Sequence, residues 1–286
     1  MAYFSSLLAQ FGIFVILATS LNLINGLTGM FCLGHAGLWA IGAYVGSAFS
    51  VFVWPSLQID FPLLQLASSC VVGMIASGAV AFIVGVACLR LKGDYLAIAT
   101  LGLGEIVKVL LTNWELVGGP RGFTGIPPIS SAAVILPVAF LCLVLLLNVR
   151  YSSFGRALMS IREDELASNS LGISTTKMKI VVFVLGSSLA GLAGPLYAHE
   201  QQFLHPENFN FMASVLILLQ VILGGMGSFT GSVLGVLFLL ILPEVLKSLG
   251  PEIAQWRMVL YSLLLIVLML LRPQGILGKK ELGGTW

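Results

Sequence analysis

Two ionisable residues lie within one apolar stretch of the chain, Tyr95–Trp114. Glu105 and Lys108 are three positions apart, so they share one face if the stretch is helical. Ionisable groups are costly in apolar surroundings, where they form neutralised pairs or mark polar paths and proton relays. We expect Glu105 and Lys108 to form a neutralised pair that faces another helix. A polar path or proton relay through Glu105 is the alternative.

Three glycine-rich segments break the apolar pattern: GLTGMFCLGHAG from Gly26, GGPRGFTGIP from Gly118 and GGMGSFTG from Gly224. Each should interrupt a helix, either as a tight loop or as irregular backbone along a substrate path, and the sequence leaves both interpretations open. We expect His35, in the first segment, to be a hydrogen-bonded structural residue. The candidates for a translocation path are Gly34, His35, Gly37, Glu105, Gly119, Gly122, Gly224 and Gly225.

Motifs for enzymatic chemistry are incomplete in this chain. The glycine-lysine pair at Gly278 is followed by a second lysine, where a phosphate-binding loop requires Ser or Thr. His199 and Glu200 begin like a zinc-protease helix, but Phe203 stands in the place of the second histidine. The four cysteines lack the paired spacing of a zinc or redox site. We therefore predict no catalytic residue, no metal site and no cofactor bound by this chain.

The composition is typical of a membrane protein, because 58% of the 286 residues are hydrophobic and only 9% are charged. One helical crossing needs roughly 20 apolar residues. We predict about nine spans, within a range of about eight to ten, and expect the first to be a true span rather than a cleaved signal peptide. The candidates are Leu7–Ile24, Leu33–Val53, Leu63–Leu89, Tyr95–Trp114, Ile129–Val149, Ile180–Ala198, Met212–Leu223, Ser232–Leu249 and Trp256–Leu271.

The distribution of charge predicts an N-terminus outside and a C-terminus inside. With alternate loops on opposite sides of the membrane, ten of the 14 lysines and arginines fall on the cytoplasmic side. The positive-inside rule favours this orientation, and an even number of spans would break the agreement. The net charge of +2 is too small to indicate a nucleic acid partner.

The most polar part of the chain, residues 150–179, holds eight of the 26 charged residues. Such a segment cannot lie in lipid, so we expect it in the cytoplasm. Ser153 is an expected N-cap, apolar residues follow at helical spacing, and Gly172 is an expected C-terminal stop. We predict one surface helix of about four turns, followed by a polar lead, Ser174–Lys179, into the next span.

Several strings occur in the order and spacing of one known family. They are LNLINGLTG from Leu21, LGHAGLWAIGAY from Leu33, RLKGDYLAIATLGLGEIVK from Arg90, GGPRGFTGIP from Gly118, FGRALMSIREDELASNSLGI from Phe154, AGLAGPLYA from Ala190, VILGGMGSFTGSVLG from Val221 and LRPQGILG from Leu271. On these strings the chain resembles, nearly end to end, the LivM family. Its members are permease subunits of bacterial high-affinity ABC importers for branched-chain amino acids.

The resemblance implies that residues 150–179 couple transport to ATP hydrolysis in partner subunits. In this interpretation the charged residues contact an ATPase, while Ala167 and Gly172 set the local packing. The residues expected to carry coupling are Arg156, Ile161, Arg162, Glu163, Asp164, Glu165, Ala167 and Gly172. The implied partners are a second, LivH-type permease, two ATPases of the LivG and LivF types that hold ATP and Mg, a soluble substrate-binding protein, and the lipid of the bacterial inner membrane.

We therefore expect an all-α integral membrane protein with an ABC importer permease fold, in which residues 1–286 form a single transmembrane domain. It would form half of a pathway for leucine, isoleucine and valine and perform no covalent chemistry. Urea and short amides are carried by similar proteins, so these substrates stay open. A stand-alone ion-coupled carrier and an intramembrane enzyme are weaker alternatives, because the sequence offers one acid in mid-span and three scattered histidines.

Overall fold

A computed structural model describes residues 2–89, 93–249, 259, 263, 274–278 and 281. Every regular element in these residues is a helix. The backbones of Phe123 and Leu204 meet in an isolated antiparallel bridge. The predicted all-α class is therefore confirmed for the part of the chain that the structure describes.

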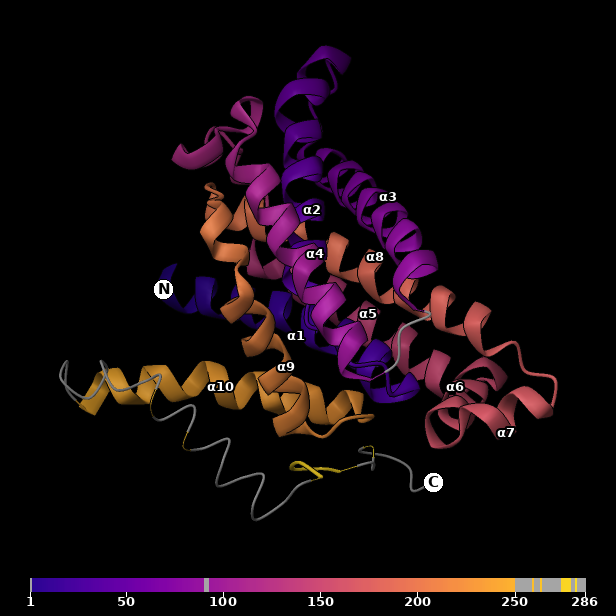
Figure 1. The fold of residues 1–286 in the computed structure, drawn as a ribbon. Helices are drawn as coiled ribbons and strands as arrows, with labels where there is room; N and C mark the ends of the chain where they lie inside the picture. Colours follow the sequence, from indigo (N-terminus) through magenta and orange to yellow (C-terminus); the bar gives the residue numbers. More distant parts are fainter. Residues whose placement is uncertain are drawn as a thin grey trace.

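Ten α-helices follow one another in the described residues, joined by short connections (Figure 1). They are α1 (Ala2–Thr28), α2 (His35–Ala48), α3 (Pro62–Cys88), α4 (Asp94–Thr112), α5 (Ala132–Tyr151), α6 (Ser153–Glu163), α7 (Glu165–Ser170), α8 (Thr175–Gln201), α9 (Phe211–Gly224) and α10 (Phe229–Leu249). A π-helical turn, η1 (Phe49–Val53), and the 3-10 turns η2 (Trp54–Leu57), η3 (Glu115–Val117), η4 (Gly119–Arg121) and η5 (Pro206–Phe209) complete the order.

Six helices of the described residues are long and apolar enough to cross a membrane: α1, α2 with its extension to Leu57, α3, α4, α5 and α8. Helices α9 and α10 meet this test only together, as a pair bent by 120°, which gives up to seven spans. The stretches Met212–Leu223 and Ser232–Leu249, predicted as separate spans, thus form one bent unit, because glycines break the helix between them. The ninth predicted span, Trp256–Leu271, lies outside the described residues, and the full count stays a prediction.

Helices α2, α3 and α8 pack backbone to backbone through glycines. A Cβ atom on Gly42 would lie 2.4 Å from the Cα atom of Gly191, and one on Gly191 would lie 2.5 Å from the carbonyl oxygen of Gly73. No side chain larger than hydrogen fits between these backbones. Membrane helices associate through such close packing, since water supplies no hydrophobic drive between them in lipid.

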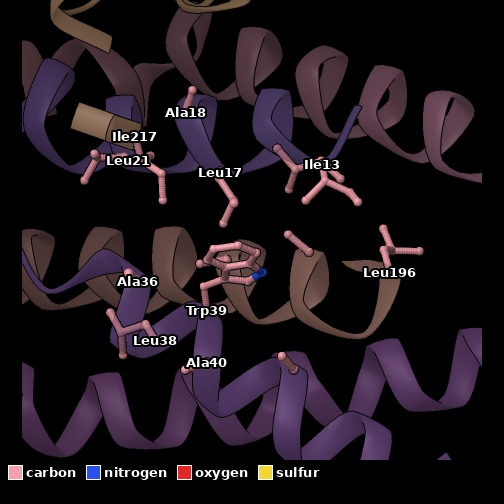
Figure 2. Close-up of a cluster of buried hydrophobic side chains, with 14 of the residues drawn as sticks. Ile13, Leu17, Ala18, Leu21, Ala36, Leu38, Trp39, Ala40, Leu196 and Ile217 are labelled. Atoms are coloured by element: carbon pink, nitrogen blue, oxygen red, sulfur yellow. The ribbon is translucent and has the colours of Figure 1, made fainter. Parts of the chain in front are cut away.

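Helix α1 lies at the centre of the bundle, where α5, α8, α9 and α10 all contact it. The most apolar stretch of α1 is 72% buried. The corresponding stretches of α4 and α5 are 28% buried, so these two helices present most of their surface outwards. Figure 2 shows the Trp39 indole of α2 packed beneath Leu17 of α1. The same indole makes edge contacts with Tyr197 and Phe209, at centroid distances of 4.9 and 4.6 Å. These contacts fix α2 against α1 and α8.

Candidate functional site

The charged segment between α5 and α8 forms two helices rather than the single helix predicted. The side chain of Ser152, not Ser153, accepts a hydrogen bond from the backbone N–H of Gly155 and caps α6. Asp164 then leaves the helical conformation, and its carboxylate accepts hydrogen bonds from the N–H groups of Leu166 and Ala167, which caps α7. The charged run therefore contains a second helix start, because aspartate is among the strongest N-caps.

The end of this segment agrees with the sequence prediction. Gly172 follows the last turn of α7 with a φ of +88°, the left-handed conformation that glycine adopts without strain. Helix α8 begins at Thr175, within the predicted polar lead, and Lys179 of its first turns pairs with Glu165 of α7 at 2.7 Å. Helices α6 and α7 lie together beyond the ends of α5 and α8 (Figure 1).

Arg162 joins this segment to the central helix. Its Nη1 atom donates a hydrogen bond to the carbonyl oxygen of Gly26 in the last turn of α1. The last four carbonyl groups of a helix have no intrahelical partner and carry the negative end of the helix dipole. An arginine is therefore well suited to cap this terminus. A Cβ atom on Gly227, in the turn between α9 and α10, would lie only 2.8 Å from the same Nη1 atom.

Asn22 holds the turn between α9 and α10 from one helical turn further back in α1. Its Oδ1 atom accepts from the N–H of Gly227 at 2.8 Å, and its Nδ2 atom donates to the carbonyl of Ser228 at 2.7 Å and to the hydroxyl of Ser232 at 2.8 Å. The side chain is fully buried. All three contacts cross more than 200 positions of sequence, so Asn22 fixes the bent pair directly to the central helix.

Glycine makes the turn itself possible. Gly225 and Gly227 have φ values of +118° and +97°, which side-chain-bearing residues rarely adopt. A Cβ atom on Gly224 would lie 2.1 Å from the carbonyl oxygen of Gly231, so the first turn of α10 lies directly against the end of α9. The predicted break in the helix at this segment is confirmed.

Glu281, near the C-terminal end of the sequence, contacts the start of α10 and the end of α5. Its carboxylate accepts hydrogen bonds from the N–H groups of Phe229 (2.7 Å) and Thr230 (3.0 Å) at the start of α10. It also forms an ion pair with Arg150 at the end of α5, with 2.8 Å between Oε1 and Nη1. Burial alone would raise the pKa of this carboxyl group, but the hydrogen bonds from Thr230 and Phe229 and the charge of Arg150 lower it overall.

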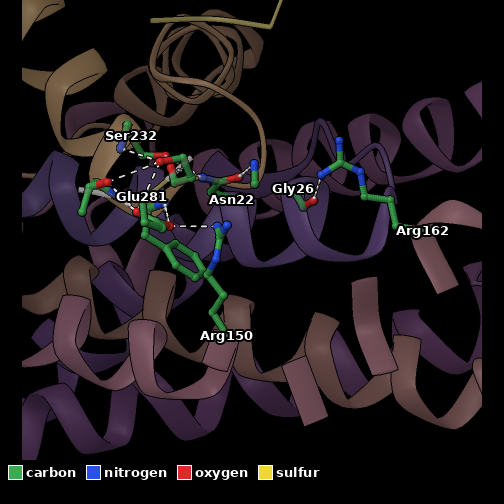
Figure 3. Close-up of polar contacts among 11 residues, drawn as sticks. Asn22, Gly26, Arg150, Arg162, Ser232 and Glu281 are labelled. Carbon is green, nitrogen blue, oxygen red and sulfur yellow. Dashed lines mark hydrogen bonds and ion pairs between the residues drawn. The ribbon is translucent and has the colours of Figure 1, made fainter. Parts of the chain in front are cut away.

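These contacts form one polar network, shown in Figure 3. A helix C-terminus is capped by arginine and a helix N-terminus by glutamate, so both ends of the network agree with the helix dipoles. The network consists of Arg162, Gly26, Asn22, Gly227, Ser228, Ser232, Phe229, Thr230, Glu281 and Arg150. It connects the charged segment, the central helix, the bent pair and the end of α5.

Only some of the predicted coupling residues are exposed for contact with a partner. Ile161 is buried, Arg162 is turned towards α1, and Glu165 is held by Lys179. Arg156 is exposed and donates to the carbonyl oxygen of Tyr151 on its own segment. Glu163, Asp164, Ala167 and Gly172 are exposed.

Sequence reasoning missed two apolar residues on the outer surface of this segment. Leu166 and Leu171 of α7 and its C-cap are 74% and 81% exposed, in a part of the chain rich in polar residues. Their exposed side chains are available for contact with a partner protein. The helical spacing of the buried Leu158 and Ile161 did not distinguish Leu166, which lies eight positions after Leu158.

The remaining path candidates at the start of α2 lie in close helix packing. A Cβ atom on Gly34 would lie 2.0 Å from the carbonyl oxygen of Thr100, and one on Gly37 would lie 2.7 Å from the Cα atom of Gly104. His35 is fully buried, with Nε2 at 2.9 Å from the hydroxyl of Ser20. His35 therefore has a hydrogen-bond partner in α1, as its expected structural role requires.

The glycines of the second break lie in a loop instead. Gly119 is the first residue of η4, with a φ of +48°, and Gly122 follows η4 with a φ of +82°. The chain then makes its bridge to Leu204, with the N–H of Phe123 donating to the Leu204 carbonyl at 2.7 Å. These glycines shape a tight loop that is hydrogen-bonded to the chain just after α8.

The predicted pair between Glu105 and Lys108 is wrong. Lys108 pairs instead with Glu207 of η5, with 2.9 Å between Nζ and Oε2. The turn η5 packs on α4 and brings its carboxylate to the lysine, a long-range contact that the local spacing could not reveal. Glu105 is half-buried on α4 and has neither an ion pair nor a hydrogen bond through its side chain among the described residues.

Several apolar spans, a bent helix pair and a capped, charged segment outside the spans define a multi-pass α-helical membrane protein. Comparison with known proteins places it further: residues 3–269 match the family described as "Branched-chain amino acid transport system / permease component". The chain belongs to this family. No solved structure matches it.

Its relatives carry matching names. The chain is 35% identical to the high-affinity branched-chain amino acid transport system permease proteins LivM of Salmonella typhimurium and of Escherichia coli, over 93% of this chain and 68% of each relative. It is 28% identical to the permease protein LivH of Escherichia coli, over 94% of this chain and 92% of that protein. The resemblance to the LivM family is thereby confirmed.

Proposed function

We propose that this chain is one of two permease halves of an ATP-driven importer for branched-chain amino acids in the bacterial inner membrane. The observation that carries the proposal is the family match over residues 3–269, together with a polar network that ties a charged segment to the spans. Similarity to both LivM and LivH supports a pathway built from two related permeases. The orientation proposed has the N-terminus outside and the C-terminus inside.

The proposed partners are those that the family implies, and the charged segment supplies a surface for one of them. Helices α6 and α7 would contact an ATPase subunit through Leu166, Leu171 and the exposed acids Glu163 and Asp164. A second ATPase would act on the other permease, and a soluble protein would deliver the substrate from outside. ATP and Mg would be held by the ATPases, and this chain would bind no cofactor and perform no covalent chemistry.

The polar network supports a specific route for coupling. A displacement of α6 by its ATPase would move Arg162 and with it the end of α1 at Gly26. Asn22 lies one turn away and holds the turn between α9 and α10, so the bent pair would move with α1. Two packed elements that shift as units can open one side of a pathway while closing the other.

The first experiment is to purify the chain from its native membrane in mild detergent and identify every accompanying protein by mass spectrometry. Co-purification of a second permease and two ATPases supports the proposal. The complex is then placed in vesicles with its binding protein, and uptake of leucine, urea and a short amide is compared. Leucine uptake that requires ATP is the expected result. A chain that runs alone and takes up substrate until a protonophore is added would instead be an ion-coupled carrier.

A further inference from the structure

Helices α3, α4 and α5 present most of their surface outwards, and α4 differs from the other two in its charges. Their most apolar stretches are 33%, 28% and 28% buried. Helix α3 contains no charged residue, and the one charge of α5, Arg150, lies in its last turn. Helix α4 carries Glu105 and Lys108 in its interior. Lys108 is neutralised by Glu207, which leaves Glu105 as the unusual group on these three surfaces.

Glu105 lies on the outward face of α4. Ile98, Gly102 and Val109 stand seven and three positions before it and four positions after it. Residues at these spacings share one face of a helix. Ile98 and Val109 are 65% and 56% exposed, so this face points away from the bundle.

The opposite side of α4 is held against the start of α2. A Cβ atom on Gly37 would lie 2.7 Å from the Cα atom of Gly104, so the two backbones touch. The hydroxyl of Thr100 accepts a hydrogen bond from the N–H of Leu33 at 3.1 Å. These contacts fix the rotation of α4 about its own axis, and the face that carries Glu105 therefore stays outside.

The carboxylate of Glu105 borders open space and has no partner. Its side chain makes neither an ion pair nor a hydrogen bond among the described residues. A Cβ atom on Gly102, one turn away, would meet nothing within 4 Å. Ionisable groups within a span face protein or a water-filled cavity and not lipid. The outward face of α4 is therefore unsuited to the lipid boundary, unlike the apolar faces of α3 and α5.

The surroundings of Glu105 fit an aliphatic α-amino acid. An ionised carboxylate only accepts hydrogen bonds, and it binds an ammonium group strongly because both partners are charged. The branched side chains of Ile98 and Val109 lie on the same face, where an aliphatic side chain of a ligand would gain free energy by leaving water. The carboxylate of the ligand is repelled by Glu105 and would point away from α4.

We infer that the outward face of α4 faces the second permease across the pathway, and that Glu105 binds the α-ammonium group of the substrate there. The inference rests on the proposed function, because it names a residue that contacts the transported amino acid. Two related permeases would enclose this face between them, and similarity to both LivM and LivH supports such a pair. Glu105 then belongs to a polar path and not to a proton relay.

The first test measures whether water reaches this face. A thiol reacts as its thiolate, which forms in water and not in lipid. The purified complex with Gly102→Cys is treated with a trimethylammonium methanethiosulfonate in mild detergent, with and without ATP. Phe140→Cys, at a 67% exposed position near the middle of α5, is the control for contact with lipid. Gly102→Cys should react at least about tenfold faster in one of the two conditions.

Two further variants complete this measurement. The wild-type complex reports the reaction of the four native cysteines, which is subtracted. Ile98→Cys lies on the same face of α4 and replaces Gly102→Cys if that variant does not assemble with its partners.

Protection by ligands identifies the group that Glu105 binds. Leucine and 3-methylbutylamine, which keeps the ammonium group, should slow the reaction of Gly102→Cys severalfold. The acid 4-methylpentanoate, which keeps the carboxylate, should not. Glu105→Gln, added to Gly102→Cys, should abolish the protection because it removes the charge at nearly constant size. Glu105→Asp keeps the charge and should retain part of the protection.

Transport supplies a second, independent readout. In vesicles with the binding protein, Glu105→Gln should lower leucine uptake roughly tenfold or more, since the substrate loses a hydrogen bond between charged groups. Glu105→Asp should retain more uptake than Glu105→Gln. Glu115→Gln removes an equal charge from the exposed turn η3 just after α4, and this control should keep uptake within about twofold of the wild type.

The outcomes separate the inference from the proposed function. If the wild-type complex transports leucine but Gly102→Cys reacts no faster than Phe140→Cys, the face of α4 does not border the pathway and the inference is wrong. It is also wrong if leucine protects Gly102→Cys equally well after Glu105→Gln is added. If the wild-type complex transports no branched-chain amino acid, the proposed function fails instead, and the reaction rates still decide whether this face borders water.

Discussion

Arg162 donates a hydrogen bond to the carbonyl oxygen of Gly26, a residue 136 positions earlier in the chain. This contact joins α6 to the last turn of α1, and a further turn back Asn22 holds the bend between α9 and α10. The charged segment is therefore not a free surface loop. It is attached to the central helix of the bundle at the point where that helix meets the bent pair.

Loss of the hydrogen bond between Arg162 and Gly26 should uncouple leucine transport from ATP hydrolysis. Arg162→Gln shortens the side chain and removes a charged hydrogen bond of about 1.5–3 kcal/mol. We expect ATP hydrolysis to continue while the amount of leucine transported per ATP falls severalfold. The measurement is uptake and ATP hydrolysis on the same vesicles. Lys177→Gln removes an equal charge from an exposed position in the same segment and is the control; equal losses in both variants would contradict the role of the contact.

Two glycines should respond to alanine with opposite signs. A Cβ atom on Gly26 would lie 1.8 Å from Oδ1 of Asn22 and 2.5 Å from the backbone nitrogen of Gly227, so Gly26→Ala should destabilise the chain by about 1–3 kcal/mol. A Cβ atom on Gly102 meets nothing within 4 Å, and Gly102→Ala should stabilise α4 by up to about 1 kcal/mol. Thermal unfolding in detergent compares them. A stable Gly26→Ala protein would show that the turn is not tightly held.

The long spans could be predicted from sequence because each is a local property. A run of apolar residues such as Ala132–Tyr151 has no other stable state in lipid than a helix. The glycine break after α9 was also visible. The 120° bend that this break allows could not be predicted, because Gly225 and Gly227 permit many directions of the chain. The bend is set by contacts with Asn22, which lies more than 200 positions away.

The candidate site was predicted only in part for the same reason. The caps and helix periodicity of the charged segment are local, so its place and its stop at Gly172 were found. The partner of each charged group lies far away in the sequence, so local patterns do not reveal it. Spacing suggested Glu105 for Lys108, but the fold supplies Glu207, and no local pattern connects Arg162 to Gly26. Asn22 in the apolar α1 was a signal that the sequence analysis did not use, since buried amides in membrane helices usually bond across helices.

The cap of α7 can be tested at two amides. Asp164→Ala should remove the hydrogen bonds to the N–H groups of Leu166 and Ala167 and destabilise this short helix by about 1 kcal/mol. Asp164→Asn should keep them, because asparagine caps as well as aspartate. Hydrogen exchange at the two amides is the measurement. We expect faster exchange in the alanine variant alone; faster exchange in both would mean that the charge, and not the cap, orders α7.

The contacts of Glu281 predict a particular dependence on pH. The pKa of this carboxyl group is lowered from 4.5, so the stability that its ionised form contributes is fully present above about pH 4.5 and is lost as the pH falls through the lowered pKa. Glu281→Gln removes the counter-charge that Glu281 supplies to the buried Arg150 and should cost about 3 kcal/mol.

Thermal unfolding of the wild type and of Glu281→Gln in detergent, measured from pH 3 to 8, tests this direction of the pH dependence. Between about pH 5 and 8 the difference between them should stay constant, because the wild-type carboxylate is ionised throughout. Below about pH 4 the difference should shrink as the wild-type group takes up a proton. Arg121→Gln, a charge change in the loop after α4, should give curves parallel to the wild type. A change in the Glu281-dependent difference near pH 6 to 7 would mean that the carboxyl group is not held by Thr230, Phe229 and Arg150 as described.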